Sequence, residues 1–204
     1  MFGPKVVAEF DSKYSGKIRV MQGWGYKYVS TGFWTQSGGI IKDVWQPAFK
    51  KIHPQKSKTW LILGLATGTI AKLIPNPAKI VGVEIDPIMI NIGRKYFALD
   101  QIPNLKIIIK NANDYLLTTN DYFDYVLVDL YCADQIPKFV YSSKFLGQLD
   151  KLGQLVILNH LFHSDSQKQA ALKLTEKLKK HFTSVTPVRS LTNLLVICHS
   201  KSDT

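Results

Sequence analysis

The stretch WLILGLATGT (residues 60–69), followed by IVGVEIDP (residues 80–87), decides the fold that this chain is expected to adopt. In the first segment an apolar strand runs into a turn of small residues, and in the second a strand ends on Glu84. Small residues let the backbone approach a ligand closely, and a helix after the turn would direct its first amides toward that ligand. A carboxylate at the tip of the next strand can accept hydrogen bonds from both ribose hydroxyls. Together the two segments predict a nucleoside pocket.

Strands and helical segments alternate from residue 59 onward, which is typical of a parallel sheet covered on both faces. Buried strands are expected at 59–64, 79–84, 105–110, 123–129 and 153–159. Helices are expected at 68–74, 87–97, 112–118, 138–150 and 165–181. Two last strands, at 184–188 and 194–199, fit a hairpin added to the edge of the sheet.

The first part of the chain has a different pattern. Residues 5–36 contain alternating, aromatic-rich pieces separated by glycines, which indicates a small antiparallel meander, and apolar residues at helical spacing follow at 40–52. We therefore expect a β meander at 1–38 and a nucleoside-binding catalytic domain at 39–204. Because so small a meander is not stable alone, its aromatic residues either cover the cleft or form the contact of a homodimer.

Composition narrows the class of protein. The 204 residues carry a formal net charge of +11, mostly as scattered lysines. This pattern indicates a solvated surface more than a nucleic-acid partner, although nucleic acid stays possible, and it disfavours capture of a polycation. No run approaches the roughly 20 apolar residues that cross a bilayer, and the start lacks a secretory signal. With two distant cysteines and no metal-ligand spacing, we expect a cytoplasmic protein without a membrane partner or a metal.

Candidate site residues are those that end the parallel strands, since ligands of open α/β sheets lie beyond the carboxyl ends. Glu84 is the candidate ribose ligand. Asn111, beside the small Ala112, either bonds an adenine edge or simply caps a helix. Asp129 ends an apolar strand, where a carboxylate is seldom left without a partner, so we expect a functional role for it. Asp86 is expected to cap the next helix.

Further polar residues follow these strands. The loop after Asp129 supplies a second acid, Asp134, which either acts in the reaction or caps a helix. His160 and His163 follow the fifth strand and could reach the substrate side of the cleft. They lack partners at metal-ligand spacing, so a metal site is not expected.

With these motifs the chain resembles the spermidine synthase-like branch of the class I S-adenosylmethionine-dependent methyltransferase superfamily. The resemblance extends over nearly the whole chain. It is carried by residues 12–14, 18–20, 36–37, 64–68, 83–87, 128–129 and 134–137. It implies an α/β, Rossmann-like class I methyltransferase fold with a mostly parallel seven-stranded sheet, helices on both faces, and a small N-terminal β meander.

The resemblance also implies a ligand and a set of site residues. The ligand would be S-adenosylmethionine or its decarboxylated form, with Glu84 on the ribose, Asn111 and Ala112 near the adenine, and Asp129 at the transfer site. The implied cofactor-binding residues are Gln36, Gly64, Ala66, Thr67, Gly68, Glu84, Ile85, Asn111 and Ala112. The implied catalytic residues are Asp129 and Asp134.

The chain departs from the pattern of aminopropyltransferases in this branch. Those enzymes carry an aspartate in the glycine turn, which holds the aminopropyl ammonium, and Thr67 stands at that place here. They also carry a glutamine where Ser15 stands, an aspartate in place of Asn111, and a tyrosine and an acid where residues 45–46 are Trp-Gln. Each change removes a charge or hydrogen bond that would hold a polyamine or its donor. The sequence therefore favours methyl transfer to an amine or hydroxyl of a small acceptor.

Three alternatives stay open. The first is aminopropyl transfer to an amine, with Asp129 and Asp134 as the acids that bind it. The second is nicotinamide-dependent oxidoreduction, which needs a small residue where Thr69 or Ile70 stands. The third is a non-catalytic protein that binds a nucleoside or nucleic acid.

Overall fold

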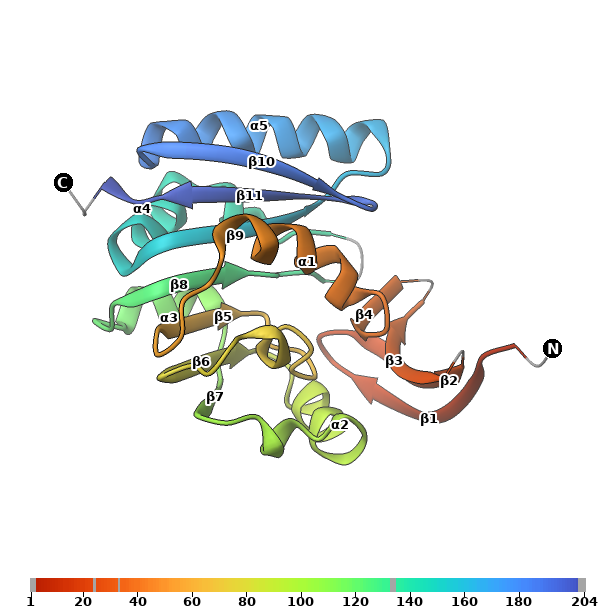
Figure 1. The fold of residues 1–204 in the computed structure, drawn as a ribbon. Coiled ribbons are helices and arrows are strands. Elements are labelled where there is room, and N and C mark those ends of the chain that lie inside the picture. Colours follow the sequence, from red (N-terminus) through yellow and green to blue (C-terminus); the bar gives the residue numbers. More distant parts are fainter. Residues whose placement is uncertain (1–2, 24, 33, 133–134, 202–204) are drawn as a thin grey trace.

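A computed structural model of the chain describes residues 3–23, 25–32, 34–132 and 135–201. It contains two sheets (Figure 1). The smaller sheet is antiparallel, with strands in sequence order. Its strands are β1 (Lys5–Ser12), β2 (Gly16–Gly23), β3 (Tyr26–Thr31) and β4 (Trp34–Gly38).

The larger sheet has seven strands in the order β10-β11-β9-β8-β5-β6-β7. Strands β5 to β9 are parallel, and β11 joins β9 in antiparallel pairing, with β10 as its hairpin partner at the edge. The strands are β5 (Thr59–Leu63), β6 (Lys79–Glu84), β7 (Leu105–Ile109), β8 (Phe123–Val128), β9 (Gly153–Leu161), β10 (Ser184–Ser190) and β11 (Asn193–His199). The predicted Rossmann-like α/β fold with its final hairpin is confirmed.

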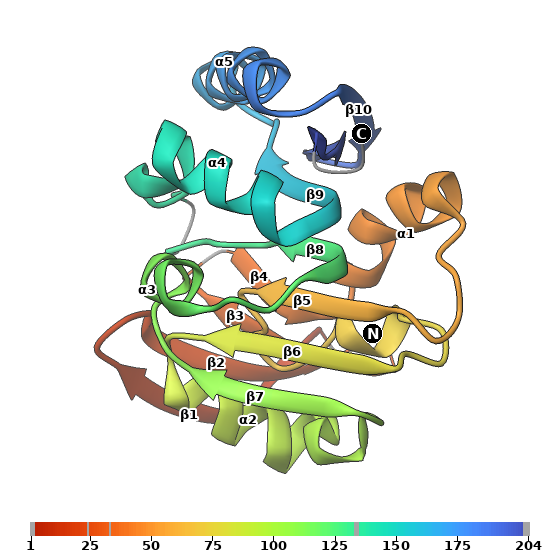
Figure 2. The same ribbon diagram turned by 90° about the vertical axis from the view of Figure 1, so that its left-hand side faces the viewer.

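Helices cover both faces of this sheet, as Figure 2 shows from its edge. Residues of α3, α4 and α5 pack into the apolar cluster on one face, and residues of α1 and α2 pack into the cluster on the other. The helices are α1 (Ile41–Ile52), α2 (Pro87–Phe97), α3 (Ala112–Thr118), α4 (Ser143–Leu152) and α5 (Asp165–His181). Short 3-10 helices are η1 (Ala71–Leu73), η2 (Leu99–Gln101) and η3 (Lys138–Tyr141).

Two predicted helices are wrong in detail. The segment 68–74 forms only the short η1, so no α-helix follows the glycine turn. The segment 138–150 is divided into η3 and α4, because the Ser142 hydroxyl accepts a hydrogen bond from the amide of Phe145 and starts a new helix there. Asp86, in contrast, caps α2 as expected, since its carboxylate accepts the amide of Ile88.

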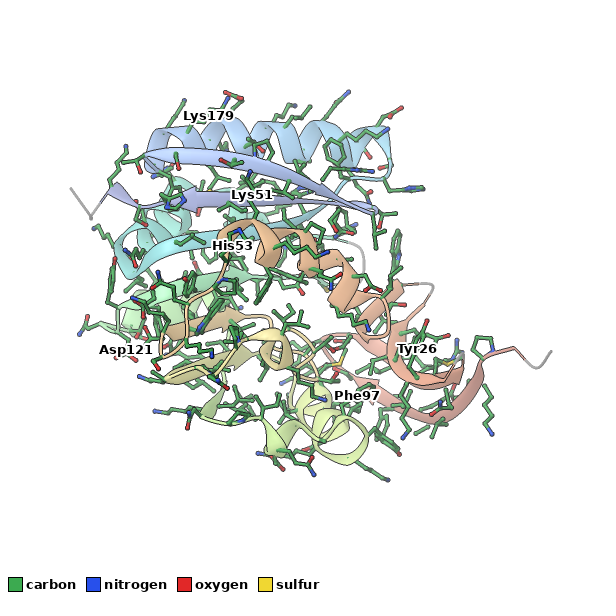
Figure 3. The ribbon with its side chains drawn as sticks, in the orientation of Figure 1. Tyr26, Lys51, His53, Phe97, Asp121 and Lys179 are labelled. Atoms are coloured by element: carbon green, nitrogen blue, oxygen red, sulfur yellow. The ribbon has the colours of Figure 1, made fainter. Side chains whose placement is uncertain are left out.

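The small sheet packs against the end of the large sheet where the parallel strands finish (Figure 1). Its apolar face contacts α2, and Phe97 at the end of that helix lies beside the small sheet (Figure 3). Two hydroxyls of the β1–β2 turn, from Ser12 and Ser15, donate to one carboxylate oxygen of Asp86 at 2.6 and 2.8 Å. These contacts fix the small sheet over the strand ends where the candidate site lies.

The charged surface and the helix lengths complete the description. Lys179 of the lysine-rich helix α5 points away from the sheet (Figure 3), and its ammonium pairs with Glu176 on the same helix. Within the residues that the structure describes, no helix combines the length and the apolar character needed to span a membrane.

Candidate active site

A cavity, called the first cavity below, opens where β5, β6, β7 and β8 end. Strand ends of the large sheet and residues of the small sheet line it together. Of the predicted site residues, those that line it are Gln36, Gly64, Ala66, Glu84, Ile85, Asn111, Ala112 and Asp129. Thr67 and Gly68 do not line it. Asp134 lies outside the described residues, so its role stays a prediction.

Glu84 ends β6 with its carboxylate held by backbone amides. One oxygen accepts the amide of Ala66 at 2.8 Å, and the other accepts the amide of Asp86 at 2.9 Å. Burial raises the pKa of Glu84, while these amides act in the opposite direction. A carboxylate offers about four acceptor positions, so two backbone bonds leave room for two hydroxyl donors. The arrangement therefore fits a ribose diol.

The glycines of the turn serve a purpose that the sequence did not reveal. Gly64 has φ +92°, and a Cβ there would lie 2.1 Å from the carbonyl oxygen of Asp129. A Cβ on Gly68 would lie 2.5 Å from a methyl carbon of Leu99. Both positions thus admit neighbouring protein segments, which corrects the view that they serve only a ligand. With no α-helix after the turn, the expected row of helix amides is also absent among the described residues.

Thr67 connects the turn to the small sheet. Its side chain is fully buried, and its hydroxyl donates to the hydroxyl of Ser37 at 2.7 Å. The Ser37 oxygen lies 2.8 Å from the hydroxyl of Thr69, which in turn accepts the amide of Gly38. This network holds the Thr67 side chain toward Ser37, so a contact between that side chain and a ligand stays a prediction.

Asn111 has both of the positions that the sequence left open. It lines the first cavity, and its side-chain oxygen accepts the amide of Asn113 at 2.8 Å to cap α3. The neighbouring Ala112 also lines the cavity and is small enough to leave space for a flat ring. Capping and ligand binding are therefore compatible at this strand end.

Asp129 follows β8 and faces the same cavity. One of its carboxylate oxygens accepts a hydrogen bond from the side-chain amide of Asn159 at 2.8 Å. Burial raises the pKa of Asp129 to about 6, and the Asn159 bond opposes that rise. The indole N–H of Trp45 acts in the same direction as Asn159, although it completes no hydrogen bond. Such a carboxylate is ionised at neutral pH and can take up a proton, as a general base must.

A chain of amides behind Asp129 was missed by sequence reasoning. The side-chain nitrogen of Asn193 donates to the oxygen of Asn159 at 2.9 Å, and the hydroxyl of Thr192 donates to Asn193 at 3.1 Å. Asn159 and Asn193 are both buried. Their signal in the sequence was an amide at the end of an apolar strand, because a buried amide requires partners. The chain fixes which way the Asn159 amide points, and so orients the Asp129 carboxylate.

A second cavity lies next to the first one. Gln36, Asp129 and Tyr131 line both cavities, and the hydroxyl of Tyr131 donates to the carbonyl of Asn159 at 3.0 Å. The remaining walls of the second cavity come from β4, the start of α1, the end of β9 and the β10–β11 turn. Two compartments therefore meet at one carboxylate, as a transfer between two bound molecules requires.

The histidines that the sequence placed near the cleft are not in it. His160 lines neither cavity; its ring is tied to the carbonyl of Leu161 and the hydroxyl of Tyr141. Burial lowers its pKa, so the imidazole is neutral at pH 7. His163 also lines neither cavity. Among the described residues, no group of three His, Cys, Asp or Glu side chains is arranged to hold a metal ion.

Comparison with known proteins identifies relatives of two kinds. No family model matches the chain. A probable polyamine aminopropyl transferase of Bifidobacterium longum is 27% identical over 128 residues, which is 60% of this chain. An eEF1A lysine and N-terminal methyltransferase homolog of Drosophila melanogaster is 27% identical over 143 residues, or 62% of this chain. The matched stretches cover 28% and 21% of these two relatives, so the chain corresponds to about a quarter of their length.

Solved structures of the same two kinds share the fold. A probable spermidine synthase from Corynebacterium glutamicum superposes with a TM-score of 0.78 at 17% identity, covering 98% of this chain and 81% of that protein. Human methyltransferase-like protein 13 in complex with SAH gives a TM-score of 0.59 at 20% identity, covering 80% of each chain. The chain thus has the fold of class I S-adenosylmethionine-dependent methyltransferases in its spermidine synthase-like form, and the resemblance is confirmed at that level.

Proposed function

We propose that this protein is an S-adenosylmethionine-dependent methyltransferase that acts on an amine or hydroxyl of a small acceptor. The observation that carries the proposal is the placement of Glu84 and Asp129 at the ends of two parallel strands, both open to the first cavity. Among the described residues that line this cavity, they are the only carboxylates. One suits the ribose of a nucleoside, and the other suits a proton that leaves an acceptor.

The chemistry of the first cavity supports an adenosyl ligand. The Glu84 carboxylate retains acceptor positions for the two ribose hydroxyls. Apolar side chains, including Val83, Met89 and Phe139, supply walls against which an adenine ring can pack. When bound, S-adenosylmethionine supplies an electrophilic methyl group on a positively charged sulfur.

The residues of the chain then position the acceptor and take up its proton. Asn159 occupies one oxygen of Asp129, which leaves the other oxygen to accept a hydrogen bond from an amine or hydroxyl. Because no strong acid is needed to expel a neutral thioether, orientation contributes most of the rate, and Asp129 supplies both orientation and a base. Asn193 supports this arrangement by orienting Asn159.

Methyl transfer is favoured over aminopropyl transfer by the charges on the page. The decarboxylated donor ends in an ammonium, which requires a carboxylate besides the one on the ribose and the one at the transfer site. Thr67 stands where aminopropyltransferases of this branch have that acid, and its side chain bonds to Ser37. The similarity to a structure bound to SAH also favours the ordinary donor.

Aminopropyl transfer is the second candidate, and the comparisons favour it. The probable spermidine synthase superposes over more of this chain than the methyltransferase does, and the Bifidobacterium relative is a probable polyamine aminopropyl transferase. Under this reading Asp129 would bind the attacking amine, and the ammonium of the donor would need a partner from outside the described lining residues.

Separate calorimetric titrations with S-adenosylhomocysteine and with its decarboxylated analogue test the choice. The proposal expects the amino-acid form to bind about tenfold or more tightly, because no lining carboxylate receives the lone ammonium. Tighter binding of the decarboxylated form would replace methyl transfer by aminopropyl transfer. Binding of neither nucleoside, together with salt-sensitive retention on nucleic acid, would support the non-catalytic alternative.

A further inference from the structure

The second cavity has no role in holding the nucleoside, and its position gives it another one. It shares Gln36, Asp129 and Tyr131 with the first cavity. A molecule bound there reaches the Asp129 carboxylate without occupying the space beside Glu84. The second cavity is therefore placed to hold the molecule that receives the transferred group.

The walls of the second cavity are mostly apolar. They are formed by Trp34, Ile40, Ile41, Val44, Leu161 and Leu191. Among the described lining residues Asp129 is the single charged one, and the other polar side chains are amides and hydroxyls. A polyamine carries an ammonium at each end, and only one of them would find a carboxylate here. A second buried ammonium would lose its hydration without gaining a partner.

Leu191 at the mouth of this cavity has an unusual conformation. It lies in the two-residue turn between Ser190 and Asn193, with φ +49° and 52% of its surface exposed. Positions with positive φ in such turns favour Asn or Gly, and an exposed leucine there is both strained and poorly solvated. Trp34 and Ile40 at the same cavity are also partly exposed. These three side chains form an apolar rim, for which contact with an apolar ligand gives a physical reason.

We infer that the second cavity is the acceptor site and takes a primary amine with an apolar body, such as an alkylamine, in preference to a polyamine. This inference rests on the proposed function. The amine end would face Asp129, and the apolar body would lie against the rim of Trp34, Ile40 and Leu191.

The reaction at this site balances in protons and electrons. The ammonium first gives one proton to Asp129. The neutral nitrogen then forms a bond to the methyl carbon of S-adenosylmethionine, while the carbon–sulfur bond breaks and its electron pair stays on sulfur. The products are a methylated ammonium ion and a neutral thioether, and Asp129 passes its proton to water.

A matched pair of amines tests the substrate class. Hexylamine and 1,6-diaminohexane have the same chain length and differ by one terminal ammonium. In calorimetry with saturating S-adenosylhomocysteine, hexylamine is expected to bind about tenfold more tightly, because the second ammonium of the diamine meets apolar walls. Equal or tighter binding of 1,6-diaminohexane would overturn the inference.

The substitution Leu191→Asn tests the rim without endangering the fold. Asparagine tolerates positive φ better than leucine does, so the melting temperature should stay the same or rise. Loss of apolar contact should weaken hexylamine binding about three- to tenfold. Leu172→Asn is the control, since Leu172 is similarly exposed but lies on α5 and lines neither cavity, and it should leave the affinity unchanged. Unchanged hexylamine binding in Leu191→Asn would contradict the assigned rim.

The design separates a failure of this inference from a failure of the proposed function. If S-adenosylhomocysteine binds but hexylamine shows no advantage over the diamine, the donor site stands and the acceptor assignment is wrong. The amine titrations are therefore repeated without nucleoside. If no nucleoside binds while hexylamine keeps its advantage and depends on Leu191, the proposed function fails and the amine site stands.

Discussion

Two carboxylates at the ends of parallel strands of one sheet are held in different ways. Both oxygens of Glu84 accept backbone amides, whereas one oxygen of Asp129 accepts a side-chain amide from Asn159. Backbone amides are fixed by the turn itself, so Glu84 has a rigid position that suits the recognition of hydroxyls. Asp129 has a pKa raised to about 6 and faces two cavities, which suits the exchange of a proton. The comparison therefore assigns binding to the end of β6 and transfer to the end of β8.

Asp129→Asn separates transfer from binding most strongly. Loss of the general base should lower the rate of methyl transfer about 10²- to 10⁴-fold. The affinity for S-adenosylhomocysteine should change little, because Glu84 and the adenine walls are untouched. Single-turnover rates and calorimetry on the same preparation provide the test. A variant that loses affinity and rate equally would show that Asp129 belongs to donor binding.

Glu84→Gln tests the other half of the comparison. A glutamine cannot accept hydrogen bonds at both ends, so one backbone amide and one ribose hydroxyl would lose their acceptor. The affinity for S-adenosylhomocysteine should fall about 10- to 100-fold, or roughly 1.4 to 2.8 kcal/mol. Asp100→Asn is the control, because Asp100 is an exposed partner of Arg94 away from both cavities. Equal affinities in wild type and Glu84→Gln would remove the basis of the donor site.

The pH dependence sharpens the account of Asp129. The rate should be lost as pH falls through about 6, where the carboxylate becomes protonated and no longer acts as a base. Stability should change in the opposite direction. The raised pKa means that the folded state holds its proton more tightly than the unfolded state, so the unfolding free energy falls as pH rises from about 4 to 6.

The variant Asp129→Asn should remove this penalty and be more stable than wild type at pH 8, by up to about 2 kcal/mol, but not at pH 4. Urea denaturation at the two pH values measures the difference. An equal difference at both pH values would mean that the Asp129 carboxylate carries no burial penalty.

The smallest effect is expected where the small sheet meets the end of β6. Ser15→Ala removes one of the two hydroxyl bonds to Asp86 and should cost about 1 kcal/mol of stability. Ser12→Ala should cost more, because the Ser12 oxygen also accepts the amides of Tyr14 and Ser15. Thermal melts of both variants provide the comparison. If neither lowers the melting temperature, the two serines do not anchor the small sheet.

Hydrophobic periodicity and turn residues were sufficient to predict the parallel strands, α2, the cap on Asp86 and the final hairpin, because each depends on local pattern. The α-helix expected at 68–74 was wrong, since small residues fit both a helix start and a tight turn. The purpose of Gly64 could not be read from sequence, because it depends on the carbonyl of Asp129, which lies far away along the chain.

The candidate site shows the same division. Glu84 and Asp129 were predicted because each ends an apolar strand with a carboxylate. The Asn159–Asn193 pair and the apolar rim at Leu191 were not, since they join segments that only the sheet order brings together. The expected homodimer and the nucleic-acid partner stay predictions.

A crystal structure with S-adenosylhomocysteine would test the central claim most directly. The account predicts the nucleoside in the first cavity, with both ribose hydroxyls about 2.5 to 3.0 Å from the Glu84 oxygens and the sulfur side facing Asp129. A nucleoside bound elsewhere, or a ribose that does not contact Glu84, would contradict it.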